Sequence, residues 1–323
     1  MTALALLSGG LDSLLAAKLI QAQGIEVIGL HFLIPFSSDK SSAIAEAGIR
    51  IERIDIRQEF LEIIKGPRHG FGSQLNPCID CKIFMLKKAR ELLPAFKAQF
   101  VFTGEVLGQR PMSQLKQSLA LIEKESGLSS LLLRPLSAQL LAETIPEQKA
   151  WVRRDKLLGF SGRGRRQQIE LARKFGIEKY AQPAGGCLLT DPQFTRRLKD
   201  LLAHDEMDIE NIELLKLGRY FRLSHQAKLV VGRNQKENEK ILSVARPDDL
   251  IFMPIEELVG PTALGRGVFD TELISLSCAI VAHYCDLNAK ITAEVVFKKF
   301  ASQEEAVLEV LPLTRERILT LRI

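Results

Sequence analysis

The sequence predicts an α/β protein built on a doubly wound parallel sheet, followed by a second, smaller α+β domain. Three observations favour this fold: short buried-strand patterns alternate with helical patterns, a glycine-rich turn follows the first strand, and the pattern changes near Asp205. The 323 residues suffice for two domains, and 46% apolar with 26% charged residues is typical of soluble globular proteins. A disordered, fibrous or collagen-like chain is therefore excluded.

Each expected strand of the parallel sheet is a short apolar run, and stretches with helical periodicity lie between these runs. The expected strands are Leu4–Leu7, Glu26–Phe32, Ile49–Ile54 and Phe100–Phe102. The expected helices are Leu14–Gln21, Ser41–Ala47, Phe60–Ile64, Lys82–Leu93, Ser113–Lys124 and Leu140–Lys149. Alternation of this kind favours parallel strand pairing with right-handed crossovers.

The second domain has a different pattern, in which strands cluster around one apolar helix. The expected elements are strands at Lys228–Gly232, Leu250–Met253, Lys290–Phe297 and Ala306–Val310, with a buried helix at Thr271–Tyr284. We therefore place the two domains at residues 1–200 and 205–323, with Phe194–Glu206 as the connector.

The small net charge of +5 hides an uneven distribution. Residues 1–200 hold 29 basic and 20 acidic side chains, whereas residues 201–323 hold 15 and 19. One basic excess contains Arg163, Arg165 and Arg166, and a second, of eight basic residues, runs from Lys216 to Arg246. Such patches are typical of polyanion binding, so the three arginines are candidate RNA contacts. Solvated helix surfaces are the alternative.

A glycine loop, Ser8-Gly-Gly-Leu-Asp-Ser13, lies between the first expected strand and the first expected helix. Two glycines let the backbone approach an anion, and the helix N-terminus supplies free N–H groups and a favourable dipole. Ser8, Gly9, Gly10 and Ser13 are therefore candidate phosphate ligands, while Asp12 suggests a role with Mg²⁺ or in orienting a nucleotide. A structural turn with a helix N-cap is the alternative.

Three cysteines form a second candidate site. Cys78 and Cys81 open an expected helix as a CxxC pair, and Cys187 follows two glycines. Three thiolates could hold a four-iron four-sulfur cluster with one open iron, or a zinc ion with water as the fourth ligand. Without a metal, one cysteine could carry a persulfide that another resolves. The remaining alternative is a structural turn with Cys187 buried elsewhere. Asp80 is a candidate acid or base.

The hexapeptide from Ser8 to Ser13 resembles the pyrophosphate-binding loop of the PP-loop (adenine nucleotide α-hydrolase-like) ATP pyrophosphatases. It lacks the Gly-Lys-Ser/Thr ending of a Walker loop. The resemblance implies a PP-loop type of doubly wound sheet and cleavage of ATP between its α- and β-phosphates, with AMP transferred to a substrate oxygen. It also implies adenine contacts at His31 and Phe32, for which packing of Phe32 is the alternative.

The loop together with the cysteines resembles the tRNA thiolation enzymes of this superfamily. Thr103–Gln114 is similar to the Gly-Glu-x-x-Gly-Gln-x-x-Ser-Gln motif of tRNA 4-thiouridine synthetases, and Leu133–Leu136 resembles the Arg-Pro-Leu that follows it. The segments Asn76-Pro-Cys78 and Gly185-Gly-Cys187 are similar to the corresponding segments of tRNA 2-thiouridylases. The resemblance covers residues 1–190. The resemblance implies that four residues line the nucleotide or nucleoside pocket: Gly104, Gln109, Ser113 and Gln114.

The C-terminal part departs from that family. We find no THUMP or rhodanese segment, which 4-thiouridine synthetases use for tRNA and, in some members, for persulfide delivery. Instead, Val231–Asn238 resembles the Gly-Arg-Asn-x-x-x-Asn segment of the RNA-binding region of NFACT proteins, over about residues 215–290. This implies a tRNA-docking module with Arg233, Asn234 and Asn238 near the RNA. A strand and turn with exposed polar residues is the alternative.

These resemblances predict an ATP-dependent tRNA sulfurtransferase. It would adenylate a uridine carbonyl, favoured at the 4-position, and then replace AMP by sulfur, so that AMP and pyrophosphate are released. The expected catalytic residues are Asp12, Cys78, Cys81 and Cys187. The expected cofactors are ATP, Mg²⁺ and a four-iron four-sulfur cluster held by the three cysteines, with zinc, or persulfide chemistry without a metal, as alternatives. The expected partners are tRNA and a sulfur donor, either free sulfide or the persulfide of a cysteine desulfurase.

Several alternatives stay open at the level of function. They are 2-thiouridine formation, adenylation of a small molecule with sulfide or ammonia as nucleophile, a catalytically inactive RNA-binding protein, and a zinc-stabilised fold with structural cysteines. No targeting segment or membrane span is evident, so we expect a cytoplasmic protein with no membrane partner. The sequence does not decide which uridine is modified, which donor supplies sulfur or how many subunits assemble.

Overall fold

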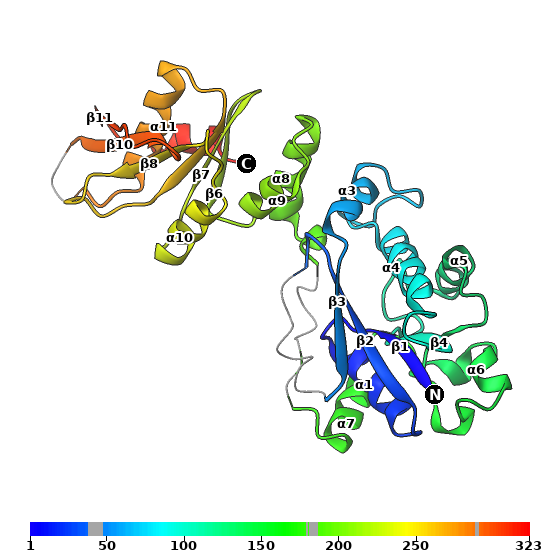
Figure 1. Cartoon of the computed structure of the whole chain (residues 1–323). Coiled ribbons are helices and arrows are strands. Elements are labelled where there is room, and N and C mark those ends of the chain that lie inside the picture. Colours follow the sequence, from blue (N-terminus) through cyan, green and yellow to red (C-terminus); the bar gives the residue numbers. More distant parts are fainter. Residues whose placement is uncertain (38–47, 179, 181–186, 288–290) are drawn as a thin grey trace. The chain divides into compact units, whose positions relative to one another are not determined.

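The computed structural model describes residues 1–37, 48–178, 180, 187–287 and 291–323. The chain divides into two compact units, Met1–Asp191 and Pro192–Ile323, both drawn in Figure 1. The division lies earlier than the boundary expected between residues 200 and 205, because most of the expected connector is a helix, α8 (Pro192–Ala203), that belongs to the second unit. The helix expected at Ser41–Ala47 lies outside the described residues.

The first unit contains a parallel sheet with the strand order β3-β2-β1-β4-β5. Its strands are β1 (Thr2–Leu6), β2 (Glu26–Leu33), β3 (Arg50–Asp55), β4 (Phe100–Thr103) and β5 (Leu132–Leu133). The predicted doubly wound parallel sheet is therefore confirmed. Because the order reverses between β1 and β4, the carboxyl ends of these two strands form the crevice where open α/β sheets bind ligands.

Helices cover both faces of this sheet (Figure 1). They are α1 (Leu11–Gln21), α3 (Arg57–Lys65), α4 (Cys78–Leu92), α5 (Lys116–Ser126), α6 (Ile145–Gln148) and α7 (Arg166–Lys174). On the α1 side, the core joins Ala3 and Ala5 of β1, Phe100 and Phe102 of β4, and Leu15 of α1. This packing fixes the start of α1 beside the ends of β1 and β4.

The prediction of a long helix at Leu140–Lys149 is wrong. The structure has a 3₁₀ turn at Ala138–Leu140 and then only the single turn of α6. Thr144 and Glu147 form a capping box that starts α6 at Ile145. Pro146, in the first turn of α6, has no amide hydrogen and cannot lie inside a longer helix without breaking a backbone hydrogen bond.

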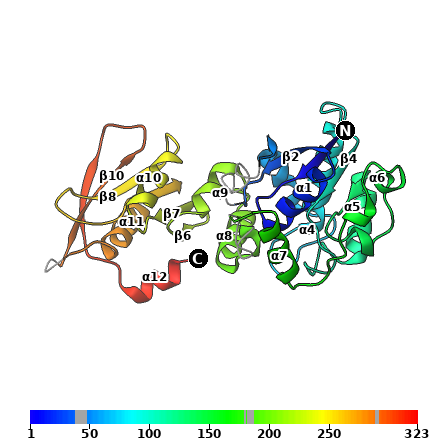
Figure 2. The same cartoon turned by 90° about the horizontal axis from the view of Figure 1, so that it is seen from below.

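The second unit contains an antiparallel sheet of six strands in the order β11-β10-β8-β9-β7-β6. The strands are β6 (Arg219–Ser224), β7 (Ala227–Val231), β8 (Leu250–Pro254), β9 (Ala263–Gly267), β10 (Ala293–Lys299) and β11 (Ala306–Val310). Besides α8, its helices are α9 (Ile209–Leu215), α10 (Gln235–Ser243), α11 (Thr271–His283) and α12 (Arg315–Leu321). The chain end returns to β6 (Figure 2), where the Ile323 amide donates to the Tyr220 carbonyl at 3.1 Å.

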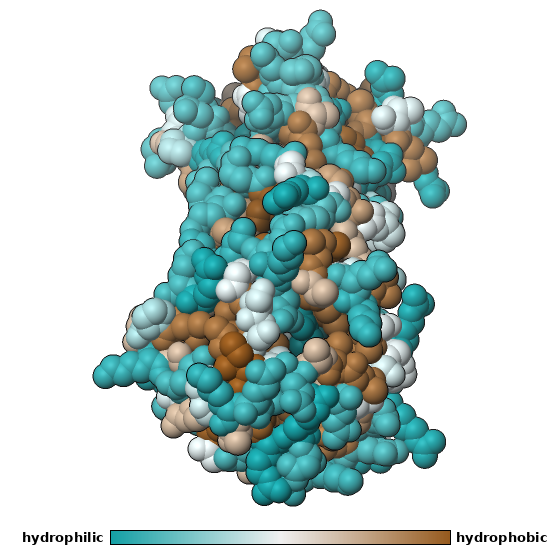
Figure 3. Space-filling view, turned by 90° about the vertical axis from the view of Figure 1, so that its right-hand side faces the viewer, coloured by the Kyte–Doolittle hydropathy of each residue, from teal (hydrophilic) through white to brown (hydrophobic). Residues whose placement is uncertain are grey.

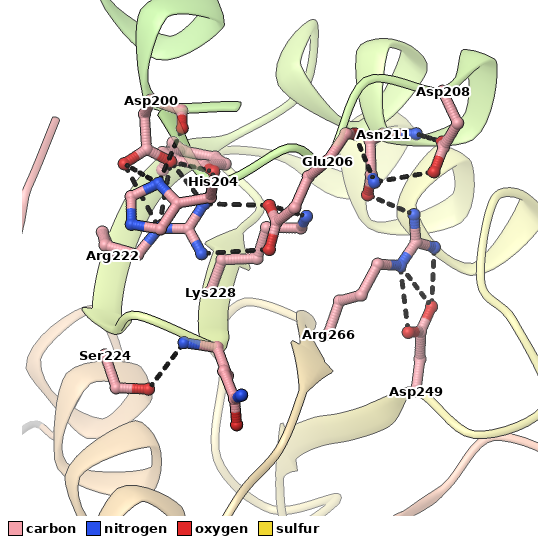
Figure 4. A network of polar contacts seen from close by, with 12 residues as sticks. Asp200, His204, Glu206, Asp208, Asn211, Arg222, Ser224, Lys228, Asp249 and Arg266 are labelled. Atoms are coloured by element: carbon pink, nitrogen blue, oxygen red, sulfur yellow. Dashed lines mark hydrogen bonds and ion pairs between the residues drawn. The ribbon is translucent and has the colours of Figure 1, made fainter. Parts of the chain in front are cut away.

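A network of buried ion pairs attaches the α8–α9 segment to this sheet (Figure 4). Arg222 of β6 donates to Asp200 of α8 at 3.0 Å and to Glu206 at 2.9 Å, and Glu206 also pairs with Lys228 of β7. The Lys228 side chain is only 2% exposed. A second group in Figure 4 joins Arg266 to Asp249 at 2.7 Å. Each of these buried cations has a carboxylate partner, which is the condition for burying a charge without a large penalty.

Hydrophilic side chains cover most of the face in Figure 3 and separate the hydrophobic side chains into small groups. Among the described residues, no helix combines the length and the apolar character that crossing a membrane requires.

Candidate functional site

The glycine loop follows β1 and ends at the first turn of α1. Gly9 adopts a left-handed conformation with φ of 72°, and Gly10 is the N-cap of α1 without a side-chain hydrogen bond to the helix. The Ser13 hydroxyl donates back to the Gly10 carbonyl at 2.8 Å. The amide N–H groups of the first helical turn are therefore not capped by a side chain, and together with the helix dipole they favour an anion.

Gly104, directly after β4, packs against the glycine loop. A Cβ atom on Gly104 would lie 2.4 Å from the Ser13 amide nitrogen and 2.5 Å from the Asp12 carbonyl carbon and oxygen. These are backbone atoms, so only glycine permits the contact. The loop after β1 and the loop after β4 thus meet at the crevice, where the sequence predicted Gly104 to lie.

Asp12 is a half-buried acid of this site. Gln109 donates to its Oδ2 at 3.0 Å, while its Oδ1 is buried and has no hydrogen-bond partner among the described residues. Burial raises the pKa of Asp12, and the Gln109 hydrogen bond and the charges of Arg165 and Arg110 oppose this rise. One carboxylate oxygen is thus available to a further ligand, with two guanidinium groups nearby.

Arg165, one of the predicted RNA contacts, lies close enough to Asp12 for its charge to lower the pKa of that carboxyl group. The turn before it pairs with the loop after β4, since the Gly162 amide donates to the Leu107 carbonyl at 2.7 Å. Its Nε is buried and lacks a hydrogen-bond partner in the described part of the chain. Arg163 and Arg166 are exposed, and Arg166 pairs with Glu170 of its own helix. Arg165 is therefore less exposed than Arg163 and Arg166 and acts on the glycine-loop site, while RNA contact at the three arginines stays a prediction.

The residues predicted to contact adenine are buried at the end of β2. The His31 ring nitrogen Nδ1 lies 2.9 Å from the Leu7 carbonyl oxygen, which links the ends of β1 and β2. Phe32 is buried as well, as the packing alternative supposed. An adenine contact at these two residues stays a prediction.

The two motifs similar to those of 4-thiouridine synthetases contact each other. Arg134, of the Arg-Pro-Leu motif, donates to Glu105 of the Gly-Glu motif at 3.3 Å and to Glu123 at 2.9 Å. Lys82, which follows Cys81, lies 3.9 Å from the same Glu105 carboxylate. This buried ion pair positions the motif behind the glycine loop and connects it to the cysteine-bearing helix. Ser113 and Gln114, also predicted for the pocket, are buried.

The three candidate cysteines gather at the N-terminus of α4. Burial, followed by the charges of Cys187 and then Cys78, raises the pKa of Cys81 to about 12, so the sulfur atoms are close enough for their charges to interact. The Leu188 amide donates to the Phe36 carbonyl at 2.9 Å, which holds the Cys187 segment beside the loop after β2. The glycines before Cys187 lie outside the described residues.

Three thiols are the right kind of donor for an iron–sulfur cluster or zinc. Nevertheless, among the described residues no three Cys, His, Asp or Glu side chains are arranged so that they could hold a metal ion. The convergence of the cysteines fits sulfur chemistry, and this geometry does not distinguish a metal site from a metal-free persulfide site.

Asp80, the candidate acid or base, is held by a histidine that the sequence analysis missed. Its carboxylate accepts from the His69 amide at 3.0 Å, and its other oxygen lies 3.0 Å from the His69 Nδ1. The other ring nitrogen of His69 lies 3.3 Å from a Glu125 oxygen. Asp80 therefore anchors the preceding loop to α4, a role that only the tertiary structure reveals.

In the second unit, two of the predicted RNA contacts also stabilise the start of α10. The Asn234 side chain caps this helix by accepting from the Glu237 amide at 3.0 Å. Arg233 is half exposed and pairs with Glu237 at Nε to oxygen distances of 3.0 Å. Asn238 has a buried Oδ1 without a hydrogen-bond partner in the described chain. RNA contact at these residues stays a prediction.

Comparison with known proteins connects the two units to two families. Residues 1–143 match the family model of the thiamine biosynthesis protein (ThiI), and residues 218–322 match that of the NFACT protein RNA binding domain. Both resemblances predicted from the sequence are confirmed.

The curated relatives of the first unit carry two kinds of name. The chain is 31% identical over 143 residues to a probable tRNA sulfurtransferase of Thermococcus kodakarensis, and this match covers 41% of the chain and 36% of that protein. The chain is also 34% identical over 128 residues to the tRNA-specific 2-thiouridylase MnmA of Petrotoga mobilis, and this match covers 32% of the chain and 35% of that protein. The chain thus spans about a third of the length of the curated relatives it matches.

Among solved structures, a 4-thiouridine synthetase in complex with RNA and ATP is similar at 19% identity and a TM-score of 0.41. The match covers 65% of this chain and 52% of that one.

Proposed function

We propose that the chain is an ATP-dependent tRNA sulfurtransferase that forms thiouridine, with the 4-position of uracil favoured. The observation that carries the proposal is the position of Asp12, beside uncapped helix amides and two arginines at the crevice between β1 and β4. The match to the ThiI family and the relatives named tRNA sulfurtransferase support it. The match of residues 218–322 supports RNA as the substrate class.

The chemistry explains why ATP is needed. A uracil carbonyl is a poor electrophile because oxide is a very poor leaving group. Attack of the carbonyl oxygen on the α-phosphorus of ATP expels pyrophosphate and leaves AMP bonded to that oxygen. A sulfide nucleophile then adds to the ring carbon, AMP departs, and loss of the sulfur proton gives the thiocarbonyl. Each uridine modified therefore costs one ATP and yields one AMP and one pyrophosphate.

The glycine loop would hold the pyrophosphate part of ATP. Its glycines permit close backbone approach, and the first-turn amides of α1 would stabilise the negative charge that develops on pyrophosphate. Arg165 and Arg110 would add positive charge at the same place. The unpartnered Asp12 oxygen would be a ligand for Mg²⁺, which would offset the negative charge of the phosphates.

Cys78, Cys81 and Cys187 would handle the transferred sulfur, either as ligands of a metal group that binds it or by carrying it themselves. We keep a four-iron four-sulfur cluster as the proposed group, since three thiolates leave one iron open to bind sulfide. Zinc, or a persulfide on one cysteine, are the alternatives that metal analysis separates. The convergence of the three thiols, rather than a ligand geometry, supports their joint role.

The test compares Asp12→Ala, Cys187→Ala and a control, Cys285→Ala, in the second unit. With ATP, sulfide and tRNA under anaerobic conditions, Asp12→Ala should lose pyrophosphate release, while its iron content should equal that of the wild type. Cys187→Ala should still bind ATP but form no thiouridine, and its iron content should fall if the cluster is present. Cys285→Ala should behave as wild type. Undiminished pyrophosphate release by Asp12→Ala would refute the ATP assignment.

Two other outcomes favour the alternatives. Pyrophosphate release that tRNA does not stimulate would favour a small-molecule substrate. An iron-free, colourless protein that is inactive with sulfide but active with the persulfide of a cysteine desulfurase would move the proposal to persulfide chemistry.

A further inference from the structure

The basic excess seen in the sequence between Lys216 and Arg246 is largely neutralised in the structure. Five of its eight basic residues pair with carboxylates: Lys216 with Glu213, Arg222 with Asp200 and Glu206, Lys228 with Glu206, Arg233 with Glu237, and Arg246 with Asp208 and Glu210. A count of charges along the chain therefore does not locate the positive surface of this unit.

Four arginines lie near the ends of β6 and β7, and two of them, Arg219 and Arg233, belong to this run. We call this set the arginine cluster: Arg197, Arg219, Arg233 and Arg322. In the described part of the chain, Glu237 is the only carboxylate within ion-pair distance of any of the four, through Arg233. The buried network in Figure 4 pairs its cations with carboxylates, whereas the arginine cluster has an excess of three positive charges.

Two members of the arginine cluster are half-buried and fixed to backbone carbonyls. Arg197 of α8 donates to the Leu215 carbonyl at 2.8 Å and to the Gly218 carbonyl at 3.1 Å. Arg219 donates to the Gly232 carbonyl at 2.8 Å, and its guanidinium carbon lies 4.1 Å from the centre of the Tyr284 ring. These contacts hold both guanidinium groups in place but leave their charge uncompensated.

The other two members are exposed. Arg233 directly follows Gly232, and its side chain is 52% exposed. Arg322 is brought to the sheet by an antiparallel bridge between its backbone and Phe221 of β6. The arginine cluster therefore combines a fixed, half-buried layer with two outward guanidinium groups.

The four charges affect one another. Burial, and then the charges of Arg233 and Arg322, lower the pKa of Arg197. Burial, together with the charges of Arg322 and Arg233, also lowers the pKa of Arg219, against the opposing effect of Tyr284. Like charges held this close destabilise the free protein, and a bound anion removes the repulsion.

We infer that the arginine cluster binds a backbone phosphate of the RNA substrate. Guanidinium groups match phosphate oxygens with paired hydrogen bonds, and the fixed pair adds a positive field beneath the exposed pair. Arg197 lies outside the residues that match the NFACT RNA binding domain, so α8 extends this surface beyond that domain. The inference rests on the proposed function in that tRNA is taken as the RNA.

The test measures binding of fluorescently labelled tRNA by the full chain at several salt concentrations, without ATP. The variant is Arg233→Gln with Arg322→Gln, and the matched control is Arg315→Gln with Arg317→Gln, which removes two exposed charges from α12. We expect about tenfold weaker binding for the cluster variant. The salt slope, which is the slope of the logarithm of the binding constant against the logarithm of the salt concentration, should be smaller by about one for each phosphate that the variant no longer binds. The control should bind within about twofold of wild type.

Equal affinity and salt slope for the cluster variant and the control would overturn the inference. Arg322→Gln alone, which removes an exposed side chain that forms no ion pair with the described residues, should still reduce the slope, so that a folding defect of the double variant cannot hide the result. The two proposals fail separately. Wild type that binds tRNA through the cluster but forms no thiouridine contradicts the proposed function alone. Thiouridine formation with unchanged tRNA affinity in the cluster variant contradicts this inference alone.

Discussion

The substitution Gly104→Ala tests whether the loops after β1 and β4 together form the ATP site. The added Cβ would lie 2.4 Å from the Ser13 amide nitrogen, whereas ordinary contacts begin at 3.4 Å. The atoms it meets belong to the backbone of the glycine loop and cannot rotate away, so the loop must move by about 1 Å. A displacement of that size in a reacting group costs about 100-fold in rate, and the overpacking costs about 1–3 kcal/mol of stability.

The assay is steady-state pyrophosphate release with ATP, sulfide and tRNA, accompanied by urea unfolding. We expect kcat/KM for ATP to fall by about 100-fold while tRNA affinity is unchanged. The matched control is Gly66→Ala at the end of α3, where an added Cβ meets no atom within 4 Å and φ is −157°. Turnover of Gly104→Ala within about threefold of wild type, in a folded protein, would show that the contact does not position the loop.

Three further predictions concern individual side chains. Arg165→Gln should raise KM for ATP by about tenfold, whereas Arg163→Gln should leave KM for ATP unchanged; an equal KM for ATP in the two variants would show that Arg165 does not act at the ATP site. Burial disfavours the charged form of Glu206, but hydrogen bonds from its two basic partners outweigh this and hold its pKa below the ordinary value of 4.5. The stabilising effect of Glu206 is present above that pH and is lost as pH falls through the folded-state pKa. The free energy of unfolding, measured with urea, should therefore fall more steeply below about pH 4.5 in wild type than in Glu206→Gln. Parallel plots of this free energy against pH would contradict the role of Glu206. Asn234→Ala should lower the free energy of unfolding by about 1 kcal/mol because α10 loses its N-cap, and an unchanged urea midpoint would contradict that role.

The parallel sheet and the glycine loop were predictable because their signals are local. Strands of a parallel sheet are buried on both faces and read as continuous apolar runs, such as Leu4–Leu7 or Phe100–Phe102. The glycine loop is one uninterrupted hexapeptide between a strand and a helix. Gly104 contacts the loop and Gln109 donates to Asp12, so both lie beside it, while nucleotide contact at these two residues stays a prediction.

Two strands of the second unit, β6 and β9, escaped prediction because their composition is not typical of strands. β6 contains Arg219 and Arg222, and only the buried network explains a charge inside that strand. β9 reads Ala-Leu-Gly-Arg-Gly. Its Gly265 leaves room for the Phe269 ring, which would lie 2.7 Å from an added Cβ. Neither requirement can be read from the residues next to it in sequence.

The role of Arg165 was also beyond local reasoning. In sequence it shares a basic run with Arg163 and Arg166, and composition alone suggested one RNA-binding patch. The hydrogen bond between Gly162 and Leu107 joins the segment before Arg165 to the loop after β4, and the charge of Arg165 acts on Asp12; no periodicity in the sequence signals this long-range proximity. The partnership of His69 with Asp80 was missed for the same reason.

The most direct measurement of the central claim is the nucleoside composition of tRNA after reaction with the full chain. Wild type would be incubated anaerobically with tRNA, ATP, Mg²⁺ and sulfide, and the digested tRNA would be analysed by mass spectrometry beside assays of AMP and pyrophosphate. We expect thiouridine to appear only with ATP, with one AMP and one pyrophosphate for each sulfur incorporated. Pyrophosphate release without thiouridine, or thiouridine formation without ATP, would contradict the claim.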